Sequence, residues 1–323
     1  MGMLSSAADA CPSGPTSLAA AEPIWFREIL CCAHCCQDQL ALAGDEYTCP
    51  RCGACFPIRD GIVSLMRPEW KAFFVELPQA WRRLEMARGN YHLPLEQLLQ
   101  LPTDPLARRL MDWLRAVLRQ RGPCRVLELG CGNGWAARVL AEDGHQVVAS
   151  DVLDDPHIGL GCAVRQRAYT GRWFGCVLTS AETLPFRAES FDCVFCHAVL
   201  GQVVDLDRTL RETARVLQPG GLFVTLHEPF RGLFTTQAQR ALGRPTTFFD
   251  LPDNARRVPL LRTLAADAGL SALVLPLAAA LTLRPNLTFP WADQNGEWPA
   301  WLESLAATYQ LDADWLREWL VRR

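Results

Sequence analysis

The chain contains fourteen cysteines, and seven of them lie within residues 31–55. Two C-x-x-C pairs occur in this segment with thirteen residues between them, Cys32 with Cys35 and Cys49 with Cys52. Each pair places two sulfurs on one tight turn, and two such turns brought together complete a tetrahedral thiolate site for Zn²⁺. Because so short a segment buries little apolar area, a bound metal would supply much of its folding energy. We therefore expect these four cysteines to be zinc ligands.

Other metal-ligating side chains crowd the same segment. Cys52 and Cys55 form an alternative C-x-x-C pair, and three further candidates lie close in sequence: Cys31, His34 and Cys36. We prefer Cys49 and Cys52 as the second pair because Gly53 then follows it, at a position where a left-handed turn is commonly needed.

A second segment with chemical potential runs from Cys124 to Asp151, "CRVLELGCGNGWAARVLAEDGHQVVASD". An apolar run enters a turn with glycines at 130, 132 and 134, and a helical pattern and a second apolar run follow. Trp135 occupies the place of the third glycine in the dinucleotide fingerprint G-x-G-x-x-G, where an indole would obstruct the close approach of helix and strand. Glu128 lies two residues before the first glycine. A carboxylate there disfavours a pyrophosphate and favours a ligand with a cationic group.

This pattern, [D/E]-x-G-x-G-x-G, resembles that of the class I methyltransferases, whose methyl donor is S-adenosylmethionine (SAM). The resemblance continues in "SAETLPFRAESFDCVFCHAVLGQV" and "LRETARVLQPGGLFVTLHEP", and it covers residues 125–229. It implies that Glu128 faces the ammonium of SAM, directly or through water, and that Asp151 accepts hydrogen bonds from the ribose hydroxyls. The residues expected to contact SAM are Glu128, Gly130, Cys131, Gly132, Gly134, Asp151, Val152, Ser180, Ala181, Glu182 and His197.

One position departs from the family pattern. Ser180 stands where the family commonly has Asp in the adenine-contacting loop, and a hydroxyl is a weaker acceptor than a carboxylate. We expect the backbone of Ala181 or the side chain of Glu182 to take over this contact.

Three side chains are candidate general bases. His197 ends one predicted strand, and His227 with Glu228 ends the next, at the edge of the sheet where ligands of such folds bind. Because the sulfonium already activates the methyl group, the protein mainly has to align the acceptor. A general base adds ~10²–10⁴-fold where the acceptor has a proton to lose. The alternative for each histidine is a structural role at the rim of the site.

These residues must be positioned by an α/β fold. Apolar runs alternate with helical patterns, and the predicted strands are 125–129, 146–150, 175–179, 191–197 and 221–227. This alternation predicts a Rossmann-like class I methyltransferase sheet, mostly parallel, with helices on both faces. Two later apolar runs, 271–277 and 279–283, predict an antiparallel terminal hairpin.

The chain divides into five predicted regions. The cysteine segment, residues 23–68, resembles a Trm112-like zinc ribbon, with a C-x-x-C pair after a short apolar strand and "FPIRDGIVSLM" at its end. A disordered tail (1–22) precedes this ribbon, and a helical linker (69–104) follows it. We expect the aromatic residues of the linker to pack in the core or between domains. The methyltransferase domain spans 105–290 and has an insert at 230–254, which is either a lid suited to an apolar acceptor, through Phe248 and Phe249, or a surface excursion. Closing helices are expected at 291–323.

Composition narrows the function further. Half of the 323 residues are apolar, and the net charge of −3 gives no global attraction for nucleic acid. No apolar stretch is long enough to span a bilayer, and the amino terminus does not read as a secretory signal, so we expect a cytoplasmic protein without a membrane partner.

The leading interpretation is a SAM-dependent methyltransferase for a small-molecule acceptor, with its ribbon packed in cis. The alternatives are an rRNA or tRNA methyltransferase that recognises RNA through the ribbon, which the acidity argues against, and a non-catalytic SAM-binding scaffold or activating subunit. The sequence leaves the acceptor, the methylated atom and the oligomeric state open.

Overall fold

The structure is a computed structural model that describes residues 22–102, 105–200 and 202–226. The predicted tail, the insert at 230–254, the terminal hairpin and the closing helices lie outside the described residues, apart from Glu22. His227 and Glu228 lie outside them as well.

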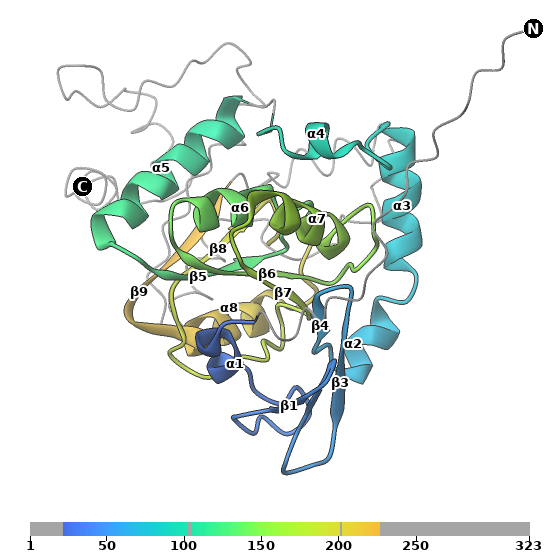
Figure 1. The fold of residues 1–323 in the computed structure, drawn as a ribbon, viewed down its shortest axis with the longest axis vertical. Helices are drawn as coiled ribbons and strands as arrows, with labels where there is room; N and C mark the ends of the chain where they lie inside the picture. The colour runs from blue at the N-terminus through green and yellow to red at the C-terminus, as the bar shows by residue number, and fades with distance from the viewer. Residues whose placement is uncertain (1–21, 103–104, 201, 227–323) are drawn as a thin grey trace, which may run out of the picture.

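Nine strands of the described chain form one sheet in the order β1-β2-β3-β4-β7-β6-β5-β8-β9 (Figure 1). The strands are β1 (Ala41–Ala43), β2 (Glu46–Thr48), β3 (Cys55–Arg59), β4 (Ile62–Ser64), β5 (Arg125–Leu129), β6 (Gln146–Asp151), β7 (Gly175–Leu178), β8 (Phe191–His197) and β9 (Leu217–Leu226). The helices are α1 (Ile24–Ile29), α2 (Pro68–Phe73), α3 (Leu77–Ala87), α4 (Leu95–Leu98), α5 (Pro105–Arg121), α6 (Trp135–Glu142), α7 (Leu160–Thr170) and α8 (Leu206–Val216).

The central strands β7, β6, β5, β8 and β9 are parallel, which confirms the predicted fold class. Strand β5 carries apolar side chains on both faces. Val126 packs with α5, α6 and α7, whereas Leu127 and Leu129 pack with α1 and α8. A parallel sheet buried on both faces needs such apolar runs, and Figure 1 shows α6 and α7 on one side of the strands and α1 and α8 on the other.

Strand β9 begins four residues earlier than the sequence predicts. Leu217 pairs with Phe191, and the next pairing joins Leu222 to Cys193, so the Pro-Gly-Gly turn lies at a shift in register. The turn residues loop out between two paired stretches, and the strand therefore extends on both sides of them.

Gly134 lets helices α6 and α7 pack closely. It precedes α6 with φ 79°, and a Cβ atom there would lie 2.6 Å from the backbone Cα of Ala163 in α7. This close approach holds the glycine loop against α7.

The N-terminal ribbon, residues 24–64, extends the central sheet. Strands β1 to β4 are joined by antiparallel pairing, and β4 then pairs in parallel with β7, through Val63 with Val177 and Ser64 with Leu178. Phe26 of α1 packs against Gly175 of β7. A Cβ atom on Gly175 would lie 2.4 Å from the Phe26 ring, so the glycine makes room for that ring. The ribbon thus packs in cis on the central sheet.

The short apolar strand predicted before the first C-x-x-C pair is wrong, because Ile24–Ile29 is helix α1. A helical turn buries Phe26 and Ile29 on one face, and only Leu30 and Cys31 continue as extended backbone, in isolated bridges to Phe186 and Asp38.

The linker forms helices α2, α3 and α4. Tyr91 and Arg82 tie it to Asp155, which follows β6 and is buried. None of the helices in the described part of the chain has the length and apolarity needed to cross a membrane.

Candidate functional site

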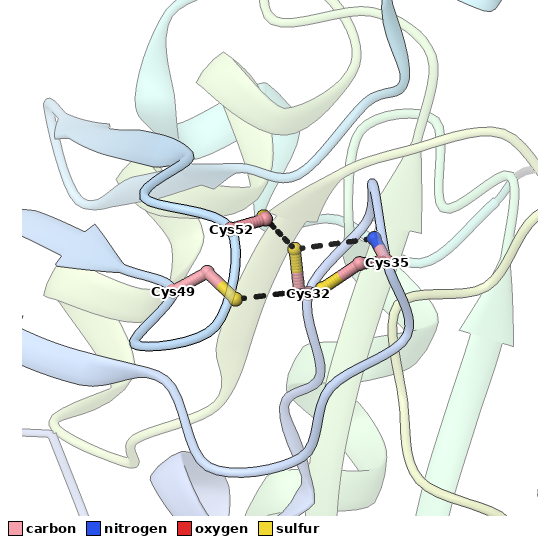
Figure 2. A group of neighbouring side chains, drawn as sticks. All are labelled: Cys32, Cys35, Cys49 and Cys52. Atoms are coloured by element: carbon pink, nitrogen blue, oxygen red, sulfur yellow. Dashed lines mark hydrogen bonds between the residues drawn. The ribbon is translucent and has the colours of Figure 1, made fainter.

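The cysteines of the two preferred pairs lie together in the N-terminal ribbon (Figure 2). The four Sγ atoms, of Cys32, Cys35, Cys49 and Cys52, all lie within 4.8 Å of one another. Cys32 Sγ lies 3.6 Å from Cys52 Sγ, and Cys35 Sγ lies 3.6 Å from Cys49 Sγ. Two sulfurs of a tetrahedral site with Zn–S bonds of ~2.3 Å are ~3.8 Å apart. The donor set and its spacing therefore fit Zn²⁺.

The two C-x-x-C turns have matching backbone geometry. The N–H of Cys36 donates to Cys32 O, and the N–H of Gly53 donates to Cys49 O, each at 2.9 Å. Gly53 has the left-handed φ of 71° that the sequence suggests, and Cys36 takes φ 57° at the equivalent place. Backbone N–H groups of residues 34 and 35 approach Cys32 Sγ at 3.3 and 3.5 Å, as donors to a thiolate would.

The alternative ligands lie outside this cluster. Cys31 is buried and its N–H donates to Pro185 O. Cys55 Sγ lies 3.6 Å from Gly53 O, and the His34 ring packs edge-on against Phe56.

A cavity of about 1080 Å³ lies between the carboxyl ends of the central strands and linker residues 73–102. It brings together most of the predicted SAM contacts. Those that line it are Glu128, Gly130, Cys131, Gly132, Asp151, Val152, Ala181, Glu182 and His197. Gly134 and Ser180 are not among its lining residues; Gly134 serves helix packing instead.

Gly132 forms an open cradle on this cavity. Its φ is 53°, a conformation that side chains rarely adopt, and no heavy atom lies within 4 Å of the place where a Cβ atom would stand. The glycine therefore leaves free space at the carboxyl end of β5, beside the end of β6.

Asp151 ends β6 and binds this loop. Its carboxylate accepts hydrogen bonds from Gly132 N at 2.9 Å and from Leu153 N at 3.0 Å. Burial raises the pKa of Asp151 to about 6, although these backbone N–H groups lower it. A carboxylate oxygen accepts more than one hydrogen bond, so each oxygen retains acceptor capacity toward the cavity.

Glu128 is a buried carboxylate near the carboxyl end of β5. Only 2% of its surface is exposed, and its Oε2 atom has no hydrogen-bond partner among the described residues. Burial raises the pKa of Glu128 well above its usual value; the Ala137 N–H opposes this shift and the nearby Asp151 adds to it. A buried acceptor without a partner is costly, so its place on the cavity indicates a ligand with a donor group.

The side chains of Ser180 and Glu182 are hydrogen-bonded to each other. The Ser180 hydroxyl lies against Glu182 Oε2, and Glu182 Oε1 accepts from Val204 N at 2.7 Å and Asp205 N at 3.3 Å. The Glu182 carboxylate thus fixes the segment that leads into α8, while Ala181 lines the cavity beside it.

His197 ends β8 and lines the cavity together with Trp135. The two rings meet edge to face, with their centroids 5.9 Å apart. The indole of Trp135 therefore forms part of the cavity wall.

The linker contributes cavity residues that the sequence did not assign to the site. Phe73, Phe74 and Trp81 line the cavity, and so does His157, from the loop after β6. The helical spacing of the three aromatic residues was visible in the sequence. Spacing alone does not tell whether an apolar stripe faces the core or a cavity.

Comparison with known proteins shows what the central segment is similar to. Residues 127–225 match the family described as "Methyltransferase domain". The sheet order around β5 and the glycine loop agree with this match. Residues 127–225 are therefore similar to methyltransferase domains.

Curated methyltransferases are similar to the chain over part of its length. The chain is 32% identical over 123 residues to the ubiquinone/menaquinone biosynthesis C-methyltransferase of Vibrio cholerae, covering 35% of this chain and 46% of that protein. It is 34% identical over 143 residues to the malonyl-[acyl-carrier protein] O-methyltransferase of Halorhodospira halophila, covering 42% of this chain and 47% of that protein. The chain thus spans less than half the length of these relatives.

Among solved structures, an S-adenosylmethionine-dependent methyltransferase from Mesorhizobium loti is 22% identical, with a TM-score of 0.40 over 54% of this chain and 88% of that chain.

Proposed function

We propose that the chain is a SAM-dependent methyltransferase that acts on a small-molecule acceptor. The observation that carries the proposal is the environment of Glu128, a buried carboxylate whose Oε2 atom has no partner among the described residues and which lines a cavity together with Gly132 and Asp151. A ligand that brings an ammonium group and two vicinal hydroxyls would satisfy both carboxylates.

The residues present fit SAM. Glu128 would accept from the ammonium of its methionine part, Gly132 leaves room for the chain beside it, and Asp151 would accept from the ribose hydroxyls. Val152 and Ala181 flank the remaining part of the same cavity and would bind the adenine. When bound, SAM supplies an activated methyl group, and the electron pair of the broken C–S bond stays with sulfur.

The protein's own contribution is to align the acceptor and exclude water. His197 lines the cavity and would take the proton of a hydroxyl or acidic N–H acceptor. A small-molecule acceptor is supported by relatives named for quinone biosynthesis, although the likeness covers less than half of their length.

The four-cysteine cluster is proposed to hold one structural Zn²⁺. Four thiolates leave no open position for a substrate, so the metal would stabilise the N-terminal ribbon and take no part in methyl transfer. Metal analysis of the purified chain tests this, with one zinc per chain expected.

The activity is tested by incubating the purified chain with SAM labelled in its methyl group and separate pools of cell RNA, protein and small metabolites. We expect label in the metabolite pool. Label in RNA would favour the nucleic-acid alternative, and SAM binding without transfer to any pool would favour a scaffold.

A further inference from the structure

We propose that the linker forms the binding wall for the methyl acceptor, and that the acceptor has an apolar body about the size of an aromatic ring and no net negative charge. The inference rests on the proposed methyltransferase function and names the substrate class of the same cavity.

The cavity has room for more than the donor. Its volume of about 1080 Å³ exceeds the ~300–1,000 Å³ of a typical single-ligand site. The predicted donor contacts, around Glu128, Gly132 and Asp151, occupy the sheet side. The opposite side of the cavity is formed by residues from the segment 73–102, and none of these is a predicted SAM contact.

The linker presents a fixed aromatic surface to this space. Trp70 is buried and lies 6.0 Å from Phe74 in a stacked arrangement, and Phe73 meets Phe74 edge to face at 5.1 Å. The Arg208 guanidinium lies 5.6 Å from the centre of the Trp70 ring, which joins this cluster to α8.

Phe73 is the most exposed member of this cluster in the described part of the chain. Its side chain lines the cavity, yet 56% of its surface is exposed. Trp81 and Leu77, one turn apart on α3, line the same cavity. An aromatic ring held in place with one side open is suited to cover the flat apolar body of a ligand.

The charges around the cavity select against an anion. Five carboxylates line it: Glu76, Glu85, Glu128, Asp151 and Glu182. Glu76 and Glu85 lie on the linker side, where the acceptor would bind. Arg88 Nη1 lies 2.9 Å from Glu85 Oε1 and partly offsets its negative charge, but an acceptor carboxylate or phosphate would still face charges of its own sign.

The test compares two exposed apolar residues of the linker. Phe73→Ser removes one aromatic ring from the cavity wall, and Met86→Ser is the matched control, because Met86 is 52% exposed on α3 but does not line the cavity. Phe73→Leu keeps apolar area at the same place. The full chain is incubated with methyl-labelled SAM and a metabolite extract that anion exchange has divided into retained and unretained fractions, the latter then partitioned into organic solvent.

We expect label in the unretained, organic-soluble fraction. Phe73→Ser should lower kcat/KM for that fraction by about ten-fold, because it removes apolar contact area. Phe73→Leu should restore most of the loss, Met86→Ser should have little effect, and all three variants should bind SAM with the wild-type Kd.

Label in the anionic fraction, or a wild-type kcat/KM for Phe73→Ser, would overturn the inference and leave the methyltransferase function standing. Failure of the wild-type chain to bind SAM, or binding without transfer to any fraction, would overturn both.

Discussion

Replacing Glu128 by Gln should change donor affinity and stability in opposite directions. The substitution keeps the size of the side chain and removes a buried carboxylate that, in the donor-free protein, has an oxygen without a hydrogen-bond partner among the described residues. A hydrogen bond to a charged group is worth ~1.5–3 kcal/mol, so losing the charge-assisted bond to the donor's ammonium should weaken SAM binding by about 10- to 100-fold. Isothermal titration calorimetry measures this directly.

The same substitution should stabilise the donor-free protein. Burial raises the pKa of Glu128, so the folded state holds this proton more tightly than the unfolded state. The wild type therefore loses stability as the pH rises from the glutamate's ordinary pKa through its raised value, and Gln has no proton to lose. A gain of about 1 kcal/mol would raise the thermal midpoint by about 2–4 °C at pH 8, with no gain at pH 4.

Glu96→Gln is the matched control, because Glu96 is exposed on α4 and does not line the cavity. It should leave both the SAM affinity and the thermal midpoint unchanged. An unchanged SAM affinity in Glu128→Gln would refute the assignment of this carboxylate to the donor.

Three further predictions concern other parts of the chain. The protonation of Asp151 should lower SAM affinity about ten-fold between pH 7 and pH 5, because the pKa of Asp151 is raised to about 6 and the protonated form is the weaker acceptor; calorimetry across this range should give a shallower profile for Asp151→Asn, in which Glu128, whose pKa is also raised, still titrates. Cys49→Ser should abolish zinc binding and lower the thermal midpoint, whereas Cys55→Ser, outside the cluster, should retain one zinc by elemental analysis; equal zinc content in the two variants would contradict the assignment. Gly134→Ala should destabilise the domain by more than 1 kcal/mol in denaturant unfolding, because its Cβ atom meets the Ala163 backbone at a positive φ.

The sequence predicts the central sheet closely because its signals are local. Strand β5 and strand β8 have the predicted bounds, and each is an apolar run that enters a turn. Glu128, Gly130, Gly132 and Asp151 fall on one cavity because the carboxyl ends of parallel strands share an edge.

Non-local features escape such reasoning. The pairing of β4 with β7 joins segments more than a hundred residues apart, and no local pattern encodes that register. The aromatic residues of the linker have helical spacing, from which we predicted packing in the core or between domains. Trp70 does pack in the core, but Phe73 lines the cavity, and helical spacing alone does not distinguish the two.

The most direct test of the account is a crystal structure of the chain with S-adenosylhomocysteine, the product form of the donor. The account predicts that its amino group lies within hydrogen-bond distance of Glu128 and that its ribose hydroxyls lie on Asp151. A ligand bound elsewhere, or a cavity that stays empty at saturating concentration, would contradict it.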